Sequence, residues 1–361
     1  MHQWAGDRHI YFAMKLSRPI AQATLYVEGA PLPAGTDEAR GTHLKVALHV
    51  DDIASAPLLV KVDISGVDVA GALRNLDAEM LGWDFEQVRK AAAASWELEL
   101  SRIRIDTVSE DVRSNFYTSL YHTMLAPTLY SDVDGRYRGM DLAVHQLPQG
   151  ANNYSTYSLW DTYRAQHPLL TLYQPEHVPD LVNGLVRMAG ESPDGPPVWP
   201  LQGVETGCMI GYHSAVVVAE AHAKGFTGID YAAAWPLFRK RAMDDDYRGL
   251  RFYRGLGYIP SDREGEAVSK TLEYAYDDWA VAQLADAAGA HADATRLRHR
   301  SRNYRHVFDR KLASCGRAPA TAAGWNRSIR AAWDTPRNGV ISPSRTRGRR
   351  VSSTSTTCTN T

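Results

Sequence analysis

Apolar residues in the second part of this 361-residue chain recur with the period of an α-helix, in one segment after another. The first such segment begins at Ser109, a residue of the type that caps helices, with Glu110 and Asp111 in the first turn. Further helical segments are predicted at residues 177–189, 209–224, 231–243, 267–288 and 292–308. Successive helices joined by short loops, with no strands between them, predict a helical toroid.

Residues 1–66 have the character of β-strands instead. Short runs rich in β-branched and aromatic residues lie at 9–16, 21–27, 43–50 and 57–64, separated by glycine- and proline-containing turns. In the third run Leu44, Val46, Leu48 and Val50 alternate along the strand, which predicts one buried face. The pattern becomes helical again from Val69. The fold class is therefore predicted to be mainly α with an N-terminal β part.

Composition excludes several classes of partner. The formal net charge is -1, so no overall charge favours binding to nucleic acid or to a membrane surface. No apolar run reaches the roughly 18 residues that a membrane-spanning helix needs. The opening residues, MHQWAGDRHIYF, lack the apolar region of a signal peptide. We therefore expect no nucleic acid and no membrane partner.

An aromatic and acidic cluster stands out in the stretch YSTYSLWDTY, residues 154–163. Trp160 is followed directly by Asp161, and Tyr157 and Tyr163 lie beside them. In a sugar site, an aromatic ring covers the apolar face of the sugar and a carboxylate accepts hydrogen bonds from its hydroxyls. A helix start would explain the same residues, with Asp161 in the first turn and Trp160 in the core. The stretch alone leaves both interpretations open.

Three further stretches belong with SLWDTYRAQHPLLTL. SDVDGRYRGMD precedes it, and WPLQGVETGCMIGYHS and SKTLEYAYDDWAVAQLA follow it. Together they resemble glycoside hydrolase family 92, the calcium-dependent exo-acting α-mannosidases. The resemblance runs from about Trp4 to Lys311. It implies the remnant of a β-sandwich at residues 1–68, a helical linker at 69–106 and an incomplete (α/α)6 toroid at 107–311.

The resemblance also implies a set of substrate-binding residues: Trp160, Asp161, Glu205 and Asp277. Each has a plainer explanation. Glu205 stands in a Gly-flanked loop before a helix and could cap it; Asp277 and Asp278 are adjacent, so at most one of them can face a cavity. Trp279 is most simply a core residue, His213 a residue of a helix face and His167 a loop residue.

Metal ligands are not apparent in the sequence. Asp132 and Asp134 of DVDGR lie in a segment too short for an EF-hand loop, so we predict a turn there, with Arg136 or Asp141 reaching the site. Full-length members of the family are expected to bind calcium, to hydrolyse terminal mannose of glycans with inversion, and to act outside the cytoplasm. The preferred linkage is expected to be α-1,2.

The family's acid motif, TE(G/S)NAWQ, and its base motif, GNDDCGQMSAW, do not occur in the chain. Residues 312–361 instead contain eight Arg, no Lys and no Glu. Suitable codons for Ile341 to Ser353, read from their third base, encode FTESNAWQTSFF, which contains the acid motif. We therefore expect a frameshift near Lys311, a disordered out-of-frame tail and no mannosidase activity of the chain as translated.

Two other functions remain open at this stage. The chain could be a non-catalytic carbohydrate-binding remnant of a mannosidase. It could also be a soluble helical protein whose basic tail binds nucleic acid.

Overall fold

The computed structural model describes residues 6, 8–51, 57–309, 313–318 and 320, and these form two compact units. The strand unit comprises His9–Asp106 together with Ser131–Arg136. The helical unit comprises Thr107–Tyr130 and the described residues from Tyr137 onward, with those before His9. The predicted out-of-frame tail, residues 312–361, lies almost entirely outside the described residues. Each unit is described below by itself.

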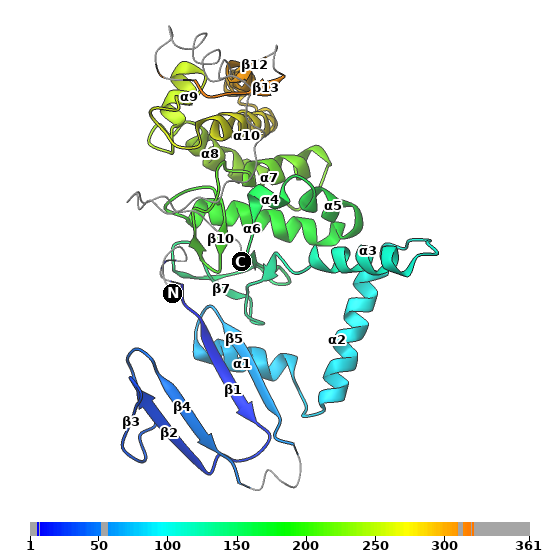
Figure 1. Cartoon of the computed structure of the whole chain (residues 1–361), viewed down its shortest axis with the longest axis vertical. Coiled ribbons are helices and arrows are strands. Elements are labelled where there is room, and N and C mark those ends of the chain that lie inside the picture. The colour runs from blue at the N-terminus through cyan, green and yellow to red at the C-terminus, as the bar shows by residue number, and fades with distance from the viewer. Residues whose placement is uncertain (1–5, 7, 52–56, 310–312, 319, 321–361) are drawn as a thin grey trace, which may run out of the picture. The chain divides into compact units, whose positions relative to one another are not determined.

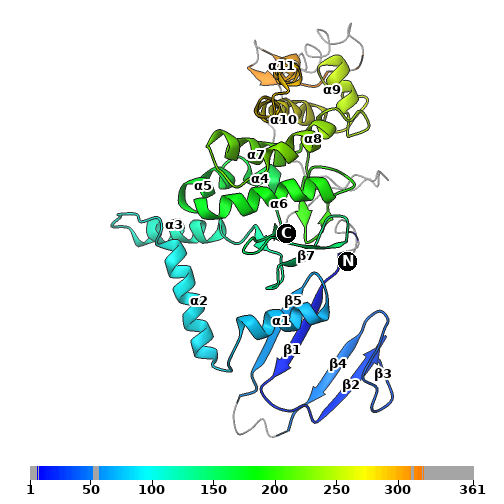
Figure 2. The same ribbon diagram turned by 180° about the vertical axis from the view of Figure 1, so that it is seen from behind.

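Two small antiparallel sheets and two helices build the strand unit (Figures 1 and 2). In one sheet, β1 (Tyr11–Leu16) pairs with β5 (Val60–Ser65); in the other, β2 (Gln22–Val27) lies between β3 (Ala30–Pro31) and β4 (Lys45–His49). The helices, α1 (Val69–Glu79) and α2 (Phe85–Leu100), lie in the range predicted to be helical. Helix α1 packs against β1 and β5 and buries Ala72 and Leu76 completely.

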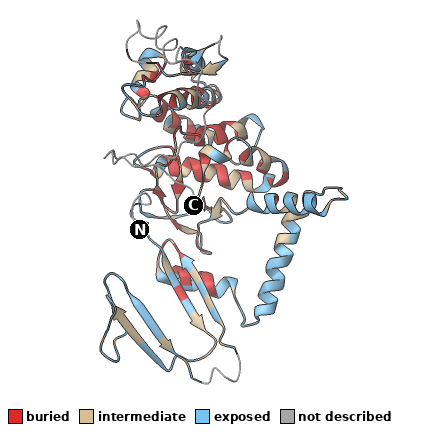
Figure 3. Ribbon diagram, in the orientation of Figure 1, coloured by how far each residue is buried: buried red, intermediate tan, exposed pale blue. Residues whose placement is uncertain are grey.

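One face of each sheet is open to solvent. Along β1 and β5, Phe12 is 63% exposed and Val62 and Ile64 are each just over half exposed. The face of β4 predicted to be buried is exposed as well: Leu44 is 47% and Val46 51% exposed, so that prediction is wrong (Figure 3). The alternation is present, but Leu48 and Val50 are only partly buried and none of the four apolar residues is fully buried.

The turn at residues 131–136 belongs to the strand unit. Asp132 is buried and accepts hydrogen bonds from Ser65 Oγ (2.8 Å) and Asn75 Nδ2 (3.0 Å). The predicted turn is confirmed, because the Gly135 N–H donates to the Asp132 carbonyl at 2.8 Å. The Arg136 guanidinium pairs with Asp68 at 2.9 Å, and the prediction that Arg136 or Asp141 reaches the site stays a prediction.

The described part of the helical unit contains nine α-helices. They are α3 (Glu110–His122), α4 (Leu159–Thr162), α5 (Gln166–Tyr173), α6 (Val178–Glu191), α7 (Ser214–Ala223), α8 (Tyr231–Ala242), α9 (Leu250–Leu256), α10 (Ala267–Ala287) and α11 (His291–Arg300). Two 3-10 turns, η1 (Pro175–His177) and η2 (Asn303–His306), follow α5 and α11. The structure is thus mainly helical with N-terminal strands, as predicted. No helix in the described ranges is both long and apolar enough to cross a membrane.

Short strand pairs interrupt the helices, so the prediction of an unbroken helical series is wrong. They are β6 (Thr128–Leu129) with β9 (Tyr154–Ser155), β7 (Arg136–Arg138) with β8 (Val144–Gln146), β10 (Pro200–Leu201) with β11 (Val204–Glu205), and β12 (Phe308–Asp309) with β13 (Ser314–Cys315). Strands of two or three residues lack a repeating apolar pattern, which is why periodicity does not detect them. They shape the loops between helices.

Local signals explain the helix ends. The Ser109 hydroxyl accepts a hydrogen bond from the Val112 N–H at 3.3 Å, which confirms the predicted cap of α3. In α6, Pro179 is in the first turn, where its missing N–H has no helical acceptor. The buried residues of α6 recur along one face, among them Leu181, Leu185 and Met188. Through this apolar face, α6 packs against α7 and α8.

Helix α10 packs against α7, α8 and α11 (Figure 1). Its Asp278 is completely buried and receives two hydrogen bonds from Arg300 of α11, Nε at 2.8 Å and Nη2 at 2.7 Å. The hydroxyls of Tyr212 and Tyr253 donate to the same carboxylate. Trp279, predicted to be a core residue, is instead 47% exposed and stacks on Tyr276.

Burial raises the pKa of Asp278 to about 6, against the effect of Arg300. Burial alone would lower the pKa of Arg300, but the charge of Asp278 raises it. Above pH 6 both groups are therefore charged, and neither has water to stabilise it.

We predict that Asp278→Asn, measured well above pH 6, lowers the free energy of unfolding by about 3–5 kcal/mol, because it leaves the buried Arg300 charge unpaired. Asp286→Asn removes a partly exposed carboxylate from the same helix and is expected to cost no more than about 1 kcal/mol. Urea unfolding followed by circular dichroism measures both. Equal midpoints for the two variants would contradict the assignment of Asp278 as the main polar contact of the core.

Candidate active site

The aromatic and acidic stretch folds as β9 followed by the single-turn helix α4. Tyr157 is completely buried, and its hydroxyl donates to the Leu181 carbonyl at 3.1 Å, which anchors the stretch to α6. Trp160 is half-buried, whereas Asp161 is exposed. The Ser158 hydroxyl donates to Asp161 Oδ2 and accepts a hydrogen bond from Trp199 Nε1 at 2.8 Å. Asp161 is thus a solvent-facing carboxylate on a rigidly held turn.

Glu273 of α10 joins this turn to the core. Its carboxylate accepts hydrogen bonds from Trp160 Nε1 (3.2 Å), the Tyr163 hydroxyl (3.2 Å) and Arg164 Nη2 (2.8 Å). The Arg164 guanidinium also lies over the rings of Trp160 and Tyr163, with its carbon 4.9 and 4.7 Å from their centroids. One carboxylate therefore fixes three side chains of this turn.

A buried histidine lies behind Glu273. His213 is 1% exposed, and its Nδ1 lies 2.7 Å from Oδ1 of Asp277. Its Nε2 lies 3.4 Å from Glu273 Oε2, although it is not aligned for a hydrogen bond there. The Tyr163 ring stacks on the imidazole with centroids 4.2 Å apart. The carboxylates of Glu273 and Asp277 thus face the same imidazole from two sides.

Asp277 itself is completely buried. Its Oδ2 accepts a hydrogen bond from the Tyr212 N–H at 2.9 Å, and His213 occupies the other oxygen. Burial raises the pKa of Asp277, while His213 acts in the opposite direction. Its predicted role in substrate binding stays a prediction, and it now requires an indirect action through His213.

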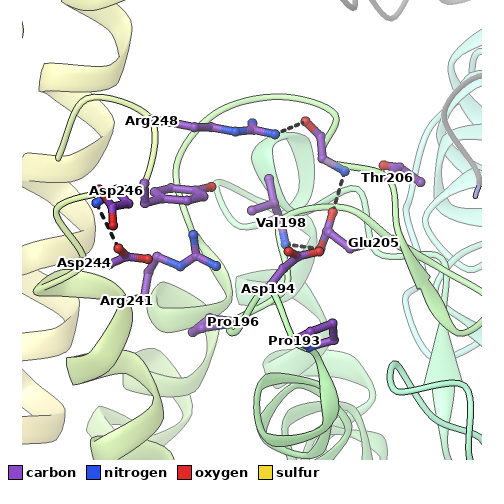
Figure 4. Close-up of a pocket in the computed structure, with 12 residues that line it drawn as sticks. Pro193, Asp194, Pro196, Val198, Glu205, Thr206, Arg241, Asp244, Asp246 and Arg248 are labelled. Carbon is purple, nitrogen blue, oxygen red and sulfur yellow. Dashed lines mark hydrogen bonds between the residues drawn. The ribbon is translucent and has the colours of Figure 1, made fainter.

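Glu205 organises the loop before α7. Its carboxylate accepts hydrogen bonds from three backbone N–H groups, those of Val198 (2.8 Å), Trp199 (3.0 Å) and Gly207 (2.7 Å). By holding Trp199, Glu205 also supports Ser158 and through it Asp161. The interpretation of Glu205 as a helix cap is wrong, because its acceptor oxygens are bonded to loop residues (Figure 4) and α7 has no side-chain cap. Its contact with substrate stays a prediction.

The four predicted residues fall into two groups, and each group reaches the turn at residues 158–164 through side-chain contacts. Asp161 connects through Ser158 and Trp199 to Glu205. Trp160 connects through Glu273 to His213 and Asp277. Sequence reasoning missed the central role of Glu273, although its position four residues before Asp277 places both on one helix face. Such an arrangement can hold the Trp160 ring and the Asp161 carboxylate in place to contact a sugar.

A calcium site needs several oxygen ligands that surround one point, and the described residues can be searched for such a group. Among the residues that the structure describes, no group of three or more His, Cys, Asp or Glu side chains is placed to hold a metal ion. Asp141, considered as a site residue, is bonded to His145 within its own hairpin loop. The described residues therefore do not fit a calcium ion, and no step of the chemistry below is assigned to one.

The glycosyl hydrolase family 92 catalytic domain matches residues 71–356 of the chain. The chain belongs to this family. The match covers the WDTY turn, the loop of Glu205 and α10, and it continues past Lys311, near which a frameshift was predicted. Membership makes the chain a relative of glycosidases and supports the resemblance inferred from its motifs.

Known structures agree with this assignment. The chain is similar to the family GH92 α-mannosidase BT3965 from Bacteroides thetaiotaomicron, at 34% identity and a TM-score of 0.79, over 88% of this chain and 43% of that one. It is also similar to the family GH92 inverting mannosidase BT2199 from the same organism, at 27% identity and a TM-score of 0.76, over 86% and 43% of the two chains.

A curated relative is described as an uncharacterized secreted glycosidase of Arthroderma benhamiae. It is 26% identical over 270 residues, which are 69% of this chain and 30% of that protein. The chain thus spans less than half the length of these relatives.

We predict that Glu273→Ala lowers the free energy of unfolding by about 1–3 kcal/mol, because it leaves the partly buried Trp160 and Tyr163 donors without an acceptor. Glu273→Gln keeps an acceptor and should cost less. Glu97→Ala, an exposed position on α2, serves as the control. Denaturant midpoints followed by tryptophan fluorescence measure the effect, and a Glu273→Ala midpoint equal to that of Glu97→Ala would refute it.

His167 lies on α5 and not in a loop as predicted. It is 4% exposed and stacks on Tyr157, and its Nε2 has no hydrogen-bond partner among the described residues. Burial lowers the pKa of His167 to about 4. The imidazole is therefore neutral in the folded protein at pH values where the unfolded chain binds a proton.

This difference predicts a pH dependence of stability. Above the unfolded pKa of about 6.5 the effect is absent, and as the pH falls toward 4 protonation favours the unfolded chain by up to roughly 3 kcal/mol. His167→Gln does not titrate and should lose less stability over this interval than the parent. His299→Gln, at an exposed position on α11, should behave like the parent. Unfolding curves at a series of pH values decide, and parallel pH profiles for all three proteins would contradict the prediction.

Proposed function

We propose that this chain derives from an exo-acting α-mannosidase, in which the turn at Trp160 and Asp161 binds a terminal mannose of a glycan. The observation that carries the proposal is the exposed carboxylate of Asp161 next to Trp160, whose indole N–H is held by Glu273. The Trp160 ring would cover one face of the sugar and Asp161 would accept hydrogen bonds from its hydroxyls. The similarity to two α-mannosidases over most of the chain supports this choice of sugar.

Hydrolysis with inversion requires one carboxyl to protonate the leaving oxygen and a second, about 6.5–9.5 Å away, to deprotonate water. The oxygens of Glu205 already accept three backbone hydrogen bonds, and Asp277 is buried behind His213. We therefore propose that neither residue is the acid or the base, and that the described part of the chain contains no catalytic carboxyl pair. The chain as translated would bind mannosides without hydrolysing them.

The finer features of the proposal rest on the family resemblance. They are the incomplete (α/α)6 toroid, the β-sandwich remnant, α-1,2 linkage preference, dependence of the full-length enzyme on calcium and a location outside the cytoplasm. The curated relative's description as a secreted glycosidase supports the last of these. The frameshift near Lys311 rests on the codon argument alone, since the family match continues to residue 356.

The proposal predicts different activities for two forms of the gene product. The 361-residue chain should release no mannose from α-mannosides, because general acid and base assistance, worth about 10²–10⁴-fold, is missing. A version with one base inserted or deleted near codon 311 and the downstream gene restored should release mannose, and a chelator should stop it. Release of mannose by the purified 361-residue chain would refute the inactivity.

Asp161 can be tested in the restored enzyme. Asp161→Ala should lower kcat/KM for α-mannosides by roughly ten- to a hundredfold, because a charged hydrogen bond to substrate contributes about 1.5–3 kcal/mol. Asp286→Ala, which removes a carboxylate from the C-terminal end of α10, should leave kcat/KM within about twofold of the parent, since surface ion pairs contribute little. Equal kcat/KM for Asp161→Ala and the parent would exclude Asp161 from the mannose site.

A further inference from the structure

The imidazole of His213 is buried next to Glu273, and its Nε2 atom is not used by the fold. His213 immediately precedes α7, but its side chain does not cap that helix. It is 1% exposed, and its Nε2 has no hydrogen-bond partner among the residues that the structure describes. Burying a polar nitrogen without a partner costs free energy, so its presence needs a physical explanation.

Three contacts fix the orientation of this imidazole. Its Nδ1 lies 2.7 Å from Asp277 Oδ1, and the other oxygen of Asp277 accepts a hydrogen bond from the Tyr212 N–H. The Tyr163 ring covers one face, with its plane inclined by 26° to the imidazole. At the Nε2 edge lies Gly211, where φ is +81° and an added Cβ would lie 2.5 Å from Nε2. Only glycine leaves room for the imidazole here, and the ring is held with Nε2 at a defined place.

That place is beside the carboxylate of Glu273. Oε2 of Glu273 lies 3.4 Å from Nε2 and accepts a hydrogen bond from the Tyr163 hydroxyl. Oε1 accepts hydrogen bonds from Trp160 Nε1 and Arg164 Nη2. With a proton on Nε2, the imidazole attracts Oε2 and opposes movement of the carboxylate away from the turn. Because the Glu273 side chain is only 13% exposed, water screens this attraction little.

We infer that His213 is a positioning residue of the sugar-binding turn, which acts through Glu273 on the ring of Trp160. The unpartnered Nε2 is explained by this role, because it restrains a carboxylate whose hydrogen bonds are directed to the turn. The identity of the ligand as a sugar rests on the proposed function, whereas the restraint on Trp160 does not. A purely structural role would consist of packing against Tyr163 and pairing with Asp277.

Two substitutions separate these roles. His213→Phe keeps a ring to pack against Tyr163 but has no nitrogen. His213→Asn keeps an N–H donor near the position of Nδ1 for Asp277 but does not extend to the position of Nε2. His167→Phe and His167→Asn are the matched controls, because His167 is also buried and also stacks on a tyrosine, Tyr157. Melting curves establish that each variant is folded, and His213→Asn serves if His213→Phe is not.

The first measurement needs no ligand. Hydrogen exchange of the Trp160 indole N–H is followed by NMR in the 361-residue chain, with the signal assigned through Trp160→Phe. We expect exchange to be about fivefold faster in both His213 variants, because the carboxylate that accepts this N–H is less restrained. Both His167 variants should exchange at the parent rate.

The second measurement is an NMR titration with methyl α-mannoside. We expect both His213 variants to bind about fivefold more weakly than the parent, because Trp160 must be ordered when the sugar binds. In a chain that already carries Glu273→Gln, His213→Asn should weaken binding no further, since the two residues act through one contact. The His167 variants should bind as the parent does.

Each result decides between these roles. Exchange at the parent rate in the folded His213 variants would overturn the inference, as would additive losses of affinity in the double variant. Faster exchange with unchanged affinity would also overturn it and leave the proposed function intact. Faster exchange in a parent chain background that binds no methyl α-mannoside would support the restraint on Trp160 and contradict the proposed mannose site.

Discussion

Two adjacent carboxylates at the centre of α10 determine how the helical unit is assembled. Consecutive residues on a helix project about 100° apart, so Asp277 and Asp278 point to different neighbours. Both are completely buried, and each therefore needs its own donors: His213 and the Tyr212 N–H for one, Arg300 with two tyrosine hydroxyls for the other. The segment before α7 and the end of α11 are fixed on two sides of α10 by this requirement.

Helix α10 also fixes the side chains of the candidate site. Glu273 lies one turn before Asp277 and holds Trp160, Tyr163 and Arg164 of the exposed turn. The Trp160 ring is therefore positioned by a chain of contacts that ends in the core. A sugar-binding ring and carboxylate gain from such support, because a group already held in its binding geometry loses little conformational freedom when the ligand arrives.

The sequence predicts those parts of the molecule that depend on local patterns. The Ser109 cap, the strand runs and the helices predicted at 177–189, 231–243 and 267–288 appear close to where expected, and the long motifs indicate the family correctly. The helices predicted at 209–224 and 292–308 are shorter in the structure, and α9 was not predicted. It does not predict which carboxylate serves as the junction of the site, since Glu273 acquires its role from residues more than 100 positions away. The prediction that one face of β4 is buried is also wrong, because an alternating pattern identifies an apolar face but not an element that covers it.

The two units satisfy their apolar surface in different ways. In the helical unit, α10 packs against α7, α8 and α11, and its buried carboxylates Asp277 and Asp278 are paired in the interior. In the strand unit, α1 covers one face of β1 and β5, and the buried Asp132 ties the 131–136 turn to α1 and β5. The opposite face, with Phe12 and Val62, remains in water. A two-stranded sheet has little stability alone, so the order of this unit depends on α1 and on that buried carboxylate.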